Sequence, residues 1–286
     1  MSTTTPTPDN LAIQLRDYRF GRDAPGHPRW WLSGDPVATA FFNALSATFP
    51  LGERFFMDSV KAHRTHATGV LRDQISAFLF QESMHSREHV VFNEIAEKAG
   101  YDMKALEDRT RRVLAFARTR TPIQQLAATC ALEHFTAILA NAILDDSRYL
   151  EGAPPEAQAL WRWHAMEEIE HKAVAFDTLV AATRGWSPLR RYILRARAMT
   201  QASILFYISI GANLRDLYRQ DGLNSLATWL KTAGYLLFRP GIVGKVFGYY
   251  FAYYRPGFHP WDHDDRALLA RAERLLNRDP AAAAPA

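Results

Sequence analysis

Two copies of the pattern Glu-x-x-His constrain this chain more than any other feature of its sequence. One copy is Glu82–His85 and the other is Glu168–His171. Residues three apart lie on the same face of an α-helix, so each glutamate and histidine point in one direction. Carboxylates and imidazoles are costly to bury unless something compensates them, and a metal ion is the commonest compensation for this combination. The pattern therefore predicts two long helices whose inner faces carry metal ligands.

The second copy is extended by a further histidine within the segment 161–171. His164 precedes Glu168 by four residues, and His171 follows it by three. At roughly 100° per residue, these three side chains share a narrow stripe of one helix. We expect His164 to be a third ligand on this helix; the alternative is a buried histidine that donates a hydrogen bond to a ligand carboxylate.

Two lone glutamates complete a twofold repeat of the pattern. Glu53 lies 29 residues before Glu82, and Glu133 lies 35 residues before Glu168. Each spacing allows two antiparallel helices, joined by a loop, to bring mid-helix residues to one level. Four carboxylates neutralise most of the charge of two divalent ions and can bridge them. We therefore predict a site for two metal ions whose ligands are Glu53, Glu82, His85, Glu133, His164, Glu168 and His171.

Three neighbouring residues are candidates for further ligands or for contacts with the ligands: His89, Glu167 and His134. Glu167 competes with Glu168, but only Glu168 forms Glu-x-x-His with His171. Glu170 is expected to face solvent. The alternative for every member of the pattern is a solvated helix face.

The rest of the chain indicates an all-α protein, since no segment alternates with the period of a β-strand. Hydrophobic residues make up 48% of the chain and charged residues 22%, as in ordinary globular proteins. The single cysteine, Cys130, excludes an internal disulfide framework and is typical of a cytoplasmic protein. The N-terminus also lacks the basic-then-apolar pattern of a secretory signal. Helices are expected at 36–63 with an interruption at Pro50, and at 70–98, 104–119, 122–145, 156–183, 188–219, 224–237 and 242–253.

These helices divide the chain into four predicted regions. An N-terminal extension covers 1–34, of which residues 1 to about 10 are expected to be disordered, and the four-helix bundle with the metal ligands covers 35–184. A helical extension that packs on the bundle covers 185–278, and a disordered tail covers 279–286. The order of ligands predicts a bundle of four helices with additional C-terminal helices.

The C-terminal extension is unusually basic. Between Arg184 and Arg255 there are 11 lysines and arginines but only two acidic residues. The uncharged run 198–214 is shorter than the roughly 20 residues of a membrane span, so a buried or interfacial helix is expected there. The extension can line an apolar substrate channel or rest on an anionic membrane surface. The sequence leaves open a homodimer, and we predict no nucleic-acid partner.

The order Glu, Glu-x-x-His, Glu, Glu-x-x-His resembles the ferritin-like carboxylate-bridged di-iron proteins over residues 36–183. The additional His164 is similar to the fourth-helix arrangement of arylamine N-oxygenases such as p-aminobenzoate N-oxygenase. The segments 49–56, 82–89, 133–134 and 255–261 resemble a bacterial family described as predicted metal-dependent hydrolases.

The di-iron resemblance implies an O2-dependent oxygenase that hydroxylates or N-oxygenates a small or lipophilic organic substrate. Two iron ions would be its cofactors. An external reductase or ferredoxin would supply electrons, because the sequence has no flavin, haem or Cys-ligated cluster motif. The alternative is a hydrolase that uses a metal-bound hydroxide, with manganese or zinc in the same ligands. A non-catalytic metal protein is a third class, which the C-terminal hundred residues disfavour.

Overall fold

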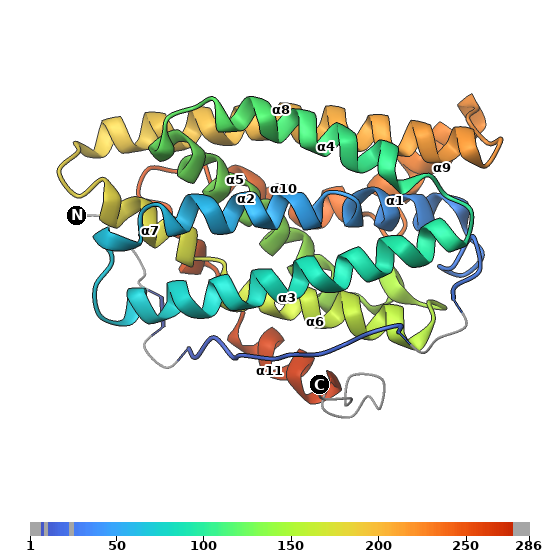
Figure 1. Ribbon diagram of the computed structural model, residues 1–286, viewed down its shortest axis with the longest axis horizontal. Coiled ribbons are helices and arrows are strands. Elements are labelled where there is room, and N and C mark those ends of the chain that lie inside the picture. The colour runs from blue at the N-terminus through green and yellow to red at the C-terminus, as the bar shows by residue number, and fades with distance from the viewer. Residues whose placement is uncertain (1–6, 9–10, 23–25, 277–286) are drawn as a thin grey trace.

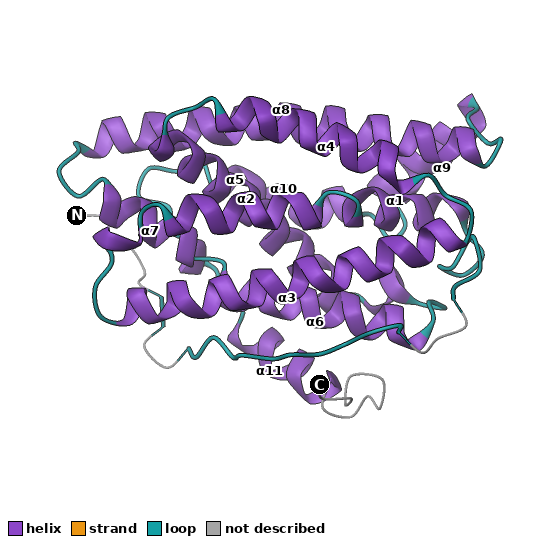
Figure 2. Ribbon diagram, viewed as in Figure 1, coloured by secondary structure: helices purple, strands orange, loops and turns teal. Residues whose placement is uncertain are grey.

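The computed structural model describes residues 7–8, 11–22 and 26–276, and every regular element among them is a helix (Figure 2). The predicted all-α fold is therefore confirmed. The α-helices are α1 (Pro36–Ser46), α2 (Phe49–Lys61), α3 (Val70–Lys98), α4 (Met103–Arg118), α5 (Pro122–Asp145), α6 (Pro155–His171), α7 (Val174–Ala182), α8 (Pro188–Gln220), α9 (Leu226–Leu237), α10 (Ile242–Ala252) and α11 (Arg266–Leu276).

Local sequence explains where the main helices begin. The Asp35 carboxylate accepts hydrogen bonds from the first free amides of α1, and proline follows in the first turn. Thr121 and Gln124 form a capping box at the start of α5. The Ser187 hydroxyl accepts a hydrogen bond from the Arg190 amide at the start of α8, which has proline at its first helical position.

The helices that carry the predicted ligands pack side by side. Helix α2 packs against α3 and α5, and α5 packs against α6 and α7 (Figure 1). The interruption predicted near Pro50 is present, because α1 ends at Ser46 and α2 begins at Phe49. A proline is tolerated there because backbone N–H groups in the first turn of a helix have no partner within the helix, so the N–H that proline lacks is not missed.

The prediction of one continuous helix over 156–183 is wrong. The chain breaks after His171 into α6 and α7. At this break the buried Lys172 ammonium binds the Asp265 carboxylate at 2.6 Å and the His263 carbonyl at 2.9 Å, and it lies 3.9 Å from the centre of the Trp261 ring. The residues after α10 are thereby attached directly behind the predicted ligands of α6.

The C-terminal helices cover the bundle. Helices α8 and α10 pack on α5, α8 also packs on α1, and α11 packs on α6. Helix α11 was not among the predicted elements. Among the described residues only α5 is long and apolar enough to span a membrane, but 72% of its most apolar window is buried in the bundle. It is the core helix that carries Glu133.

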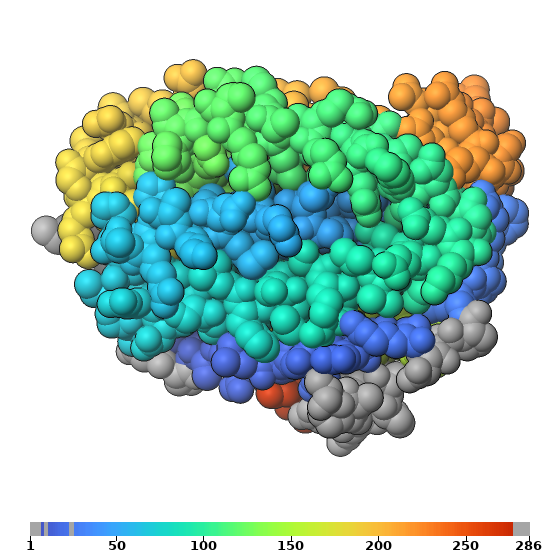
Figure 3. Space-filling model, in the orientation of Figure 1, coloured from blue at the N-terminus to red at the C-terminus, as the bar shows by residue number. Residues whose placement is uncertain are grey.

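The N-terminal segment 11–22 lies across the lower side of α3 and α6, where Figures 1 and 3 show it in dark blue. The Gln81 side chain of α3 donates to the Gln14 carbonyl at 2.8 Å, and Arg16 binds carboxylates of α6. This part of the extension is therefore tied to the bundle. The disorder predicted for 1–10 and 279–286 concerns residues that, apart from 7–8, lie outside the described part of the chain.

Candidate metal centre

Four helices deliver the seven predicted ligands to one place in the interior. Glu53 comes from α2, Glu82 and His85 from α3, and Glu133 from α5, while the remaining three come from α6. None of the seven residues is more than 3% exposed. The structure thus brings together every residue of the predicted set.

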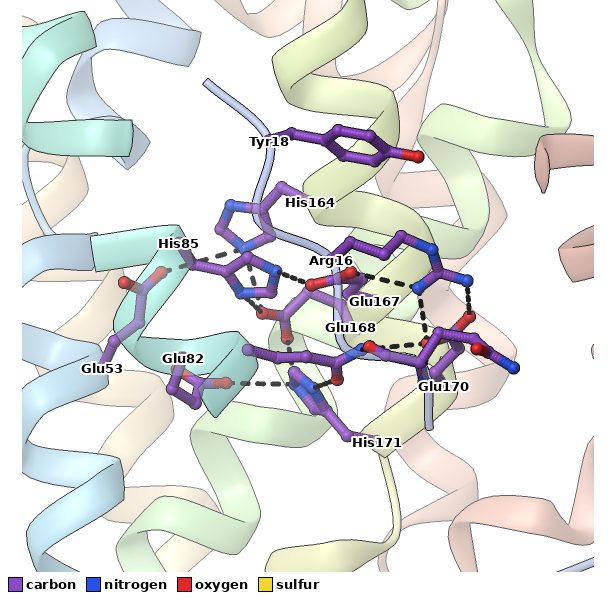
Figure 4. A network of polar contacts seen from close by, with 12 residues as sticks. Arg16, Tyr18, Glu53, Glu82, His85, His164, Glu167, Glu168, Glu170 and His171 are labelled. Carbon is purple, nitrogen blue, oxygen red and sulfur yellow. Dashed lines mark hydrogen bonds and ion pairs between the residues drawn. The ribbon is translucent and has the colours of Figure 1, made fainter. Parts of the chain in front are cut away.

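The seven residues form two groups within the centre. Figure 4 labels each of them except Glu133. Within each group, one potential ligand atom per residue lies within 4.8 Å of all the others. The first group is Glu53, His85 and His164, and the second is Glu82, Glu133, Glu168 and His171.

Glu168 lies between the two groups. Its Oε1 is 2.9 Å from His164 Nε2 and 3.4 Å from His85 Nδ1, which belong to the first group. Its Oε2 is 3.5 Å from His171 Nε2 in the second group. One carboxylate with an oxygen facing each group has the geometry of a ligand that bridges two cations.

Most of the inward-facing atoms have no hydrogen bond. Within the described part of the chain, no hydrogen-bond partner exists for either carboxylate oxygen of Glu53, Glu82 or Glu133. The same holds for Glu168 Oε2 and His85 Nδ1. His171 Nε2 has no hydrogen bond either, but it forms an ion-pair contact with Glu82 Oε1 at 3.1 Å. Buried polar atoms are nearly always satisfied, and leaving one unpaired costs about 1–3 kcal/mol. These unpaired atoms converge on one site, and their oxygen and nitrogen types suit two divalent cations.

The pKa values of three carboxyl groups reflect the cost of burying these charges close together. Burial raises the pKa of Glu53, Glu82 and Glu133, and repulsion from the neighbouring glutamates raises it further. Burial also raises the pKa of Glu168, but the surrounding histidines, His171 foremost, outweigh burial and hold it well below its ordinary value. The centre thus holds more negative charge than its own histidines can neutralise.

The histidines respond in two ways. Burial lowers the pKa of His85, but Glu167 and Glu168 outweigh it and raise the value to about 9. For His164, burial and the positive charge of His85 lower the pKa to about 4. Cations that bind here must therefore displace protons from some ligands.

Each of two histidines is held by a partner outside the two groups. His85 Nε2 donates to Glu167 Oε2 at 3.0 Å, so that Nδ1 faces the centre. His171 Nδ1 donates to Gln81 Oε1 at 2.9 Å, so that Nε2 faces the centre. Such contacts orient the ring and fix its tautomer, as they do around bound metals.

His164 is oriented by a longer chain of hydrogen bonds. The Ser46 hydroxyl donates to the Asn93 side-chain oxygen at 2.6 Å and accepts from His89 Nδ1 at 2.9 Å. His89 Nε2 then accepts from His164 Nδ1 at 2.6 Å. His164 Nε2 therefore faces the centre, 2.9 Å from Glu168 Oε1 and 3.9 Å from Glu53 Oε1, and His89 acts on the centre through His164.

Residues outside the predicted set complete this shell. Arg16 binds Glu167 Oε1 at 3.0 Å and Glu170 Oε1 at 2.8 Å (Figure 4). The prediction that Glu170 faces solvent is wrong, because this carboxylate is buried and also accepts from Gln81 at 2.9 Å. No periodicity marks Arg16, since it lies in an irregular segment that only the tertiary fold brings to α6.

Two other residues that the sequence singled out lie apart from the centre. The ring of His134 contacts the C-terminal helices, where its Nε2 donates to the Tyr249 carbonyl at 3.0 Å. It touches none of the seven residues through a hydrogen bond or ion pair. Cys130 is buried in an apolar cluster, and burial raises the pKa of its thiol well above the ordinary value. A buried thiol with a raised pKa is not suited to act as a nucleophile.

An apolar cavity of about 660 Å³ lies beside the centre, between α2, α4, α5 and α8. Phe49 lines this cavity, and its ring centre is 4.6 Å from that of His164 and 4.7 Å from that of His89. None of the seven residues lines the cavity. The Phe49 ring is therefore part of the wall between the cavity and the first group.

Residues 14–264 match the model of a protein family described as predicted metal-dependent hydrolases. The chain belongs to this family. No curated protein and no solved structure matches it. The family match supports a metal-dependent enzyme, and it favours the hydrolase alternative over the oxygenase that the di-iron resemblance implies. The buried carboxylate and histidine groups fit that description.

Proposed function

We propose that the protein is a hydrolase that depends on two metal ions held by the seven residues of the centre. The observation that carries this proposal is the set of unpaired, fully buried oxygens and nitrogens of Glu53, Glu82, Glu133, Glu168, His85 and His171. Metal binding relieves their repulsion and satisfies them at once, so that ions and bundle stabilise each other.

Divalent ions in this position supply a Lewis acid and an activated water at neutral pH. In hydrolysis the water oxygen adds to the acyl carbon of an ester or amide, the bond to the leaving group breaks, and a proton passes to that group. This chemistry agrees with the family description. Iron, manganese and zinc all accept such a mixture of carboxylate and imidazole ligands.

The residues of the chain have separate tasks in this scheme. Glu168 bridges the two groups, while Glu167, Gln81 and His89 hold the three histidines in their orientations. Phe49 and the neighbouring apolar wall exclude bulk water from the first group, which strengthens electrostatic interactions there.

O2-dependent oxidation is the second candidate, and His164 favours it. Its Nε2 faces the first group directly, which gives that group two histidines, as in the arylamine N-oxygenases that the sequence resembles. In this reaction one oxygen atom of O2 enters the substrate and the other leaves as water. Two electrons and two protons are needed, and an external reductase or ferredoxin would deliver the electrons.

The source of the product oxygen separates these candidates. We would load the protein with iron, manganese or zinc, and would offer aliphatic and aryl esters in H2¹⁸O without O2. Label in the acid product, lost in the Glu168→Gln variant, is expected for hydrolysis. Product that forms only with O2 and a reductant, and takes its label from ¹⁸O2, would overturn the hydrolase proposal and support the oxygenase. An unloaded sample serves as the control for contaminating esterases.

A further inference from the structure

The cavity beside the metal centre has the size of a ligand-binding pocket. Its volume of about 660 Å³ falls within the roughly 300–1,000 Å³ that is usual for such pockets. Phe116 of α4 and Ile193 of α8 line it and are 51% and 45% exposed, so it opens to solvent between these helices. Apolar side chains form most of its wall, which suits a ligand with an apolar body.

The charges in this wall all have one sign. Arg120, Arg190 and Arg197 line the cavity, whereas no aspartate or glutamate does. In the described part of the chain, none of these three guanidinium groups forms an ion pair. Arg190 stacks on Trp186 at 3.7 Å and Arg120 stacks on Phe116 at 4.4 Å, so both are held beside the cavity. Unneutralised cations at an apolar pocket indicate an anionic group on the ligand.

Two of the three arginines lie at one end of the cavity, and Arg197 lies about 10 Å further along α8. Arg120 follows the C-terminus of α4, and Arg190 lies in the first turn of α8. Phe206 lines the other end together with Phe49, and both pack against the same apolar cluster. At a rise of about 1.5 Å per residue, roughly 24 Å of α8 separates Arg190 from Phe206. The cavity is therefore elongated, with a cationic end and an apolar end.

The apolar end is the one that approaches the metal centre. Phe49 contacts His164, and Gly52 also lines the cavity immediately before Glu53 in α2. A Cβ atom on Gly52 would meet only the Phe56 ring, at 4.0 Å, so this glycine leaves open space towards the cavity. A ligand that lies along the cavity would place the end remote from the arginines nearest the centre.

We propose that this cavity binds an elongated aliphatic or aryl-aliphatic molecule that carries one anionic group. The arginines hold the carboxylate or phosphate, and the apolar body extends to Phe49 and Gly52. The binding site stands on the cavity alone. The further statement that this ligand is the substrate rests on the proposed function.

Displacement of a dansylated undecanoate probe by dodecanoate tests the binding in metal-free protein. We expect dodecanoate to bind, dodecanol to bind at least tenfold more weakly, and added salt to weaken only the acid. Replacing Arg120, Arg190 and Arg197 by glutamine together should weaken dodecanoate at least tenfold. Arg184→Gln is the matched control, because Arg184 is exposed in the same basic region but does not line the cavity. Equal affinity of acid and alcohol, or an unchanged triple variant, would overturn the anionic site.

A second variant tests the position of the ligand. Gly52→Leu places a side chain in the cavity without backbone strain, because Gly52 is helical, and should weaken dodecanoate at least tenfold. Gly248→Leu, at a helical glycine of α10 outside the cavity, should leave affinity unchanged. If Gly52→Leu binds normally while it remains folded, the ligand does not occupy this cavity.

Vesicles of phosphatidylglycerol distinguish the sources of the anionic group. Protein separated from such vesicles is extracted, and the bound lipid is counted. Phospholipid retained by the native chain but not by Gly52→Leu identifies a membrane lipid, and dodecanoate binding without retained phospholipid identifies a free acid. Neither ligand bound would overturn the proposal. Dodecanoate binding by a protein that takes up no metal would keep the cavity site and overturn the metal centre instead.

Discussion

The two ligand groups of the centre differ in charge although both lie in the same bundle. The first group combines one carboxylate with two histidines, whereas the second combines three carboxylates with one histidine. Phe49 and the cavity lie beside the first group through His164. We therefore expect the second group to hold its cation more tightly, and the first group to be the one that a substrate meets. The second group thus carries more negative charge, and the first group lies nearer the cavity, although only the Glu168 side chain lies between them.

Removing the carboxylate shared by the groups should have the largest effect. Glu168→Ala deletes the residue whose oxygens face both groups, so metal content should fall below about one ion per chain. Glu94→Ala, at an exposed position of α3, should leave it unchanged. Plasma mass spectrometry of protein loaded with iron or manganese measures both. Two ions retained by folded Glu168→Ala would show that neither group depends on the shared carboxylate.

Replacing one histidine in each group should separate the sites. His171→Ala removes the only imidazole of the carboxylate-rich group, and His164→Ala removes one of two imidazoles from the other. Because bound carboxylates dominate the attraction for cations, His164→Ala should keep one tightly bound ion and lose the other. Competition with a fluorescent chelator gives the two affinities. Identical losses in the two variants would show that the groups are not distinct.

Neutralising one carboxylate should change stability in opposite directions with and without metal. Glu133→Gln relieves repulsion among buried glutamates. The free energy of unfolding of the metal-free variant should therefore be larger than that of the metal-free native chain, by about 1–3 kcal/mol. With metal the variant should be the less stable, because a ligand is missing. Urea unfolding with and without a chelator measures both. The same sign in both conditions would contradict the account.

The smallest effect is expected from residues that only orient ligands. Glu167→Gln weakens the hydrogen bond that fixes His85, and should reduce metal affinity in the first group by about 10- to 100-fold. Arg16→Gln should have a weaker effect in the same direction, since Arg16 acts through Glu167. Arg148→Gln, which removes an exposed ion pair with Asp146, is the control. A loss of metal affinity confined to the second group would contradict the contact of Glu167 and Arg16 with the first group through His85.

Helical periodicity was enough to predict which residues meet, but not how they divide. Spacing of three and four residues put Glu82 with His85 on one face of α3. The structure instead groups Glu82 with His171 and His85 with His164, because residues one turn apart on a helix face different neighbours across the bundle. Periodicity defines a face and carries no information on the partner opposite.

Other features depended on tertiary contacts that have no local signal. Arg16 reaches the centre from an irregular segment, and Glu170 is buried because Arg16 and Gln81 bind it. The break after His171 coincides with the contact between Lys172 and Asp265, which are distant in the sequence. No proline or glycine lies between Pro155 and Gly185, so the sequence carries no local signal for this break.

The central claim is that the centre holds two cations, and metal stoichiometry tests it most directly. Protein stripped with a chelator, reloaded anaerobically with Fe(II) or Mn(II) and freed of excess metal should contain two ions per chain. His164→Ala, prepared alongside it, should contain one. Fewer than about one ion per chain in the folded native protein would contradict the account, because the buried oxygens of Glu53, Glu82 and Glu133 would then have no partner.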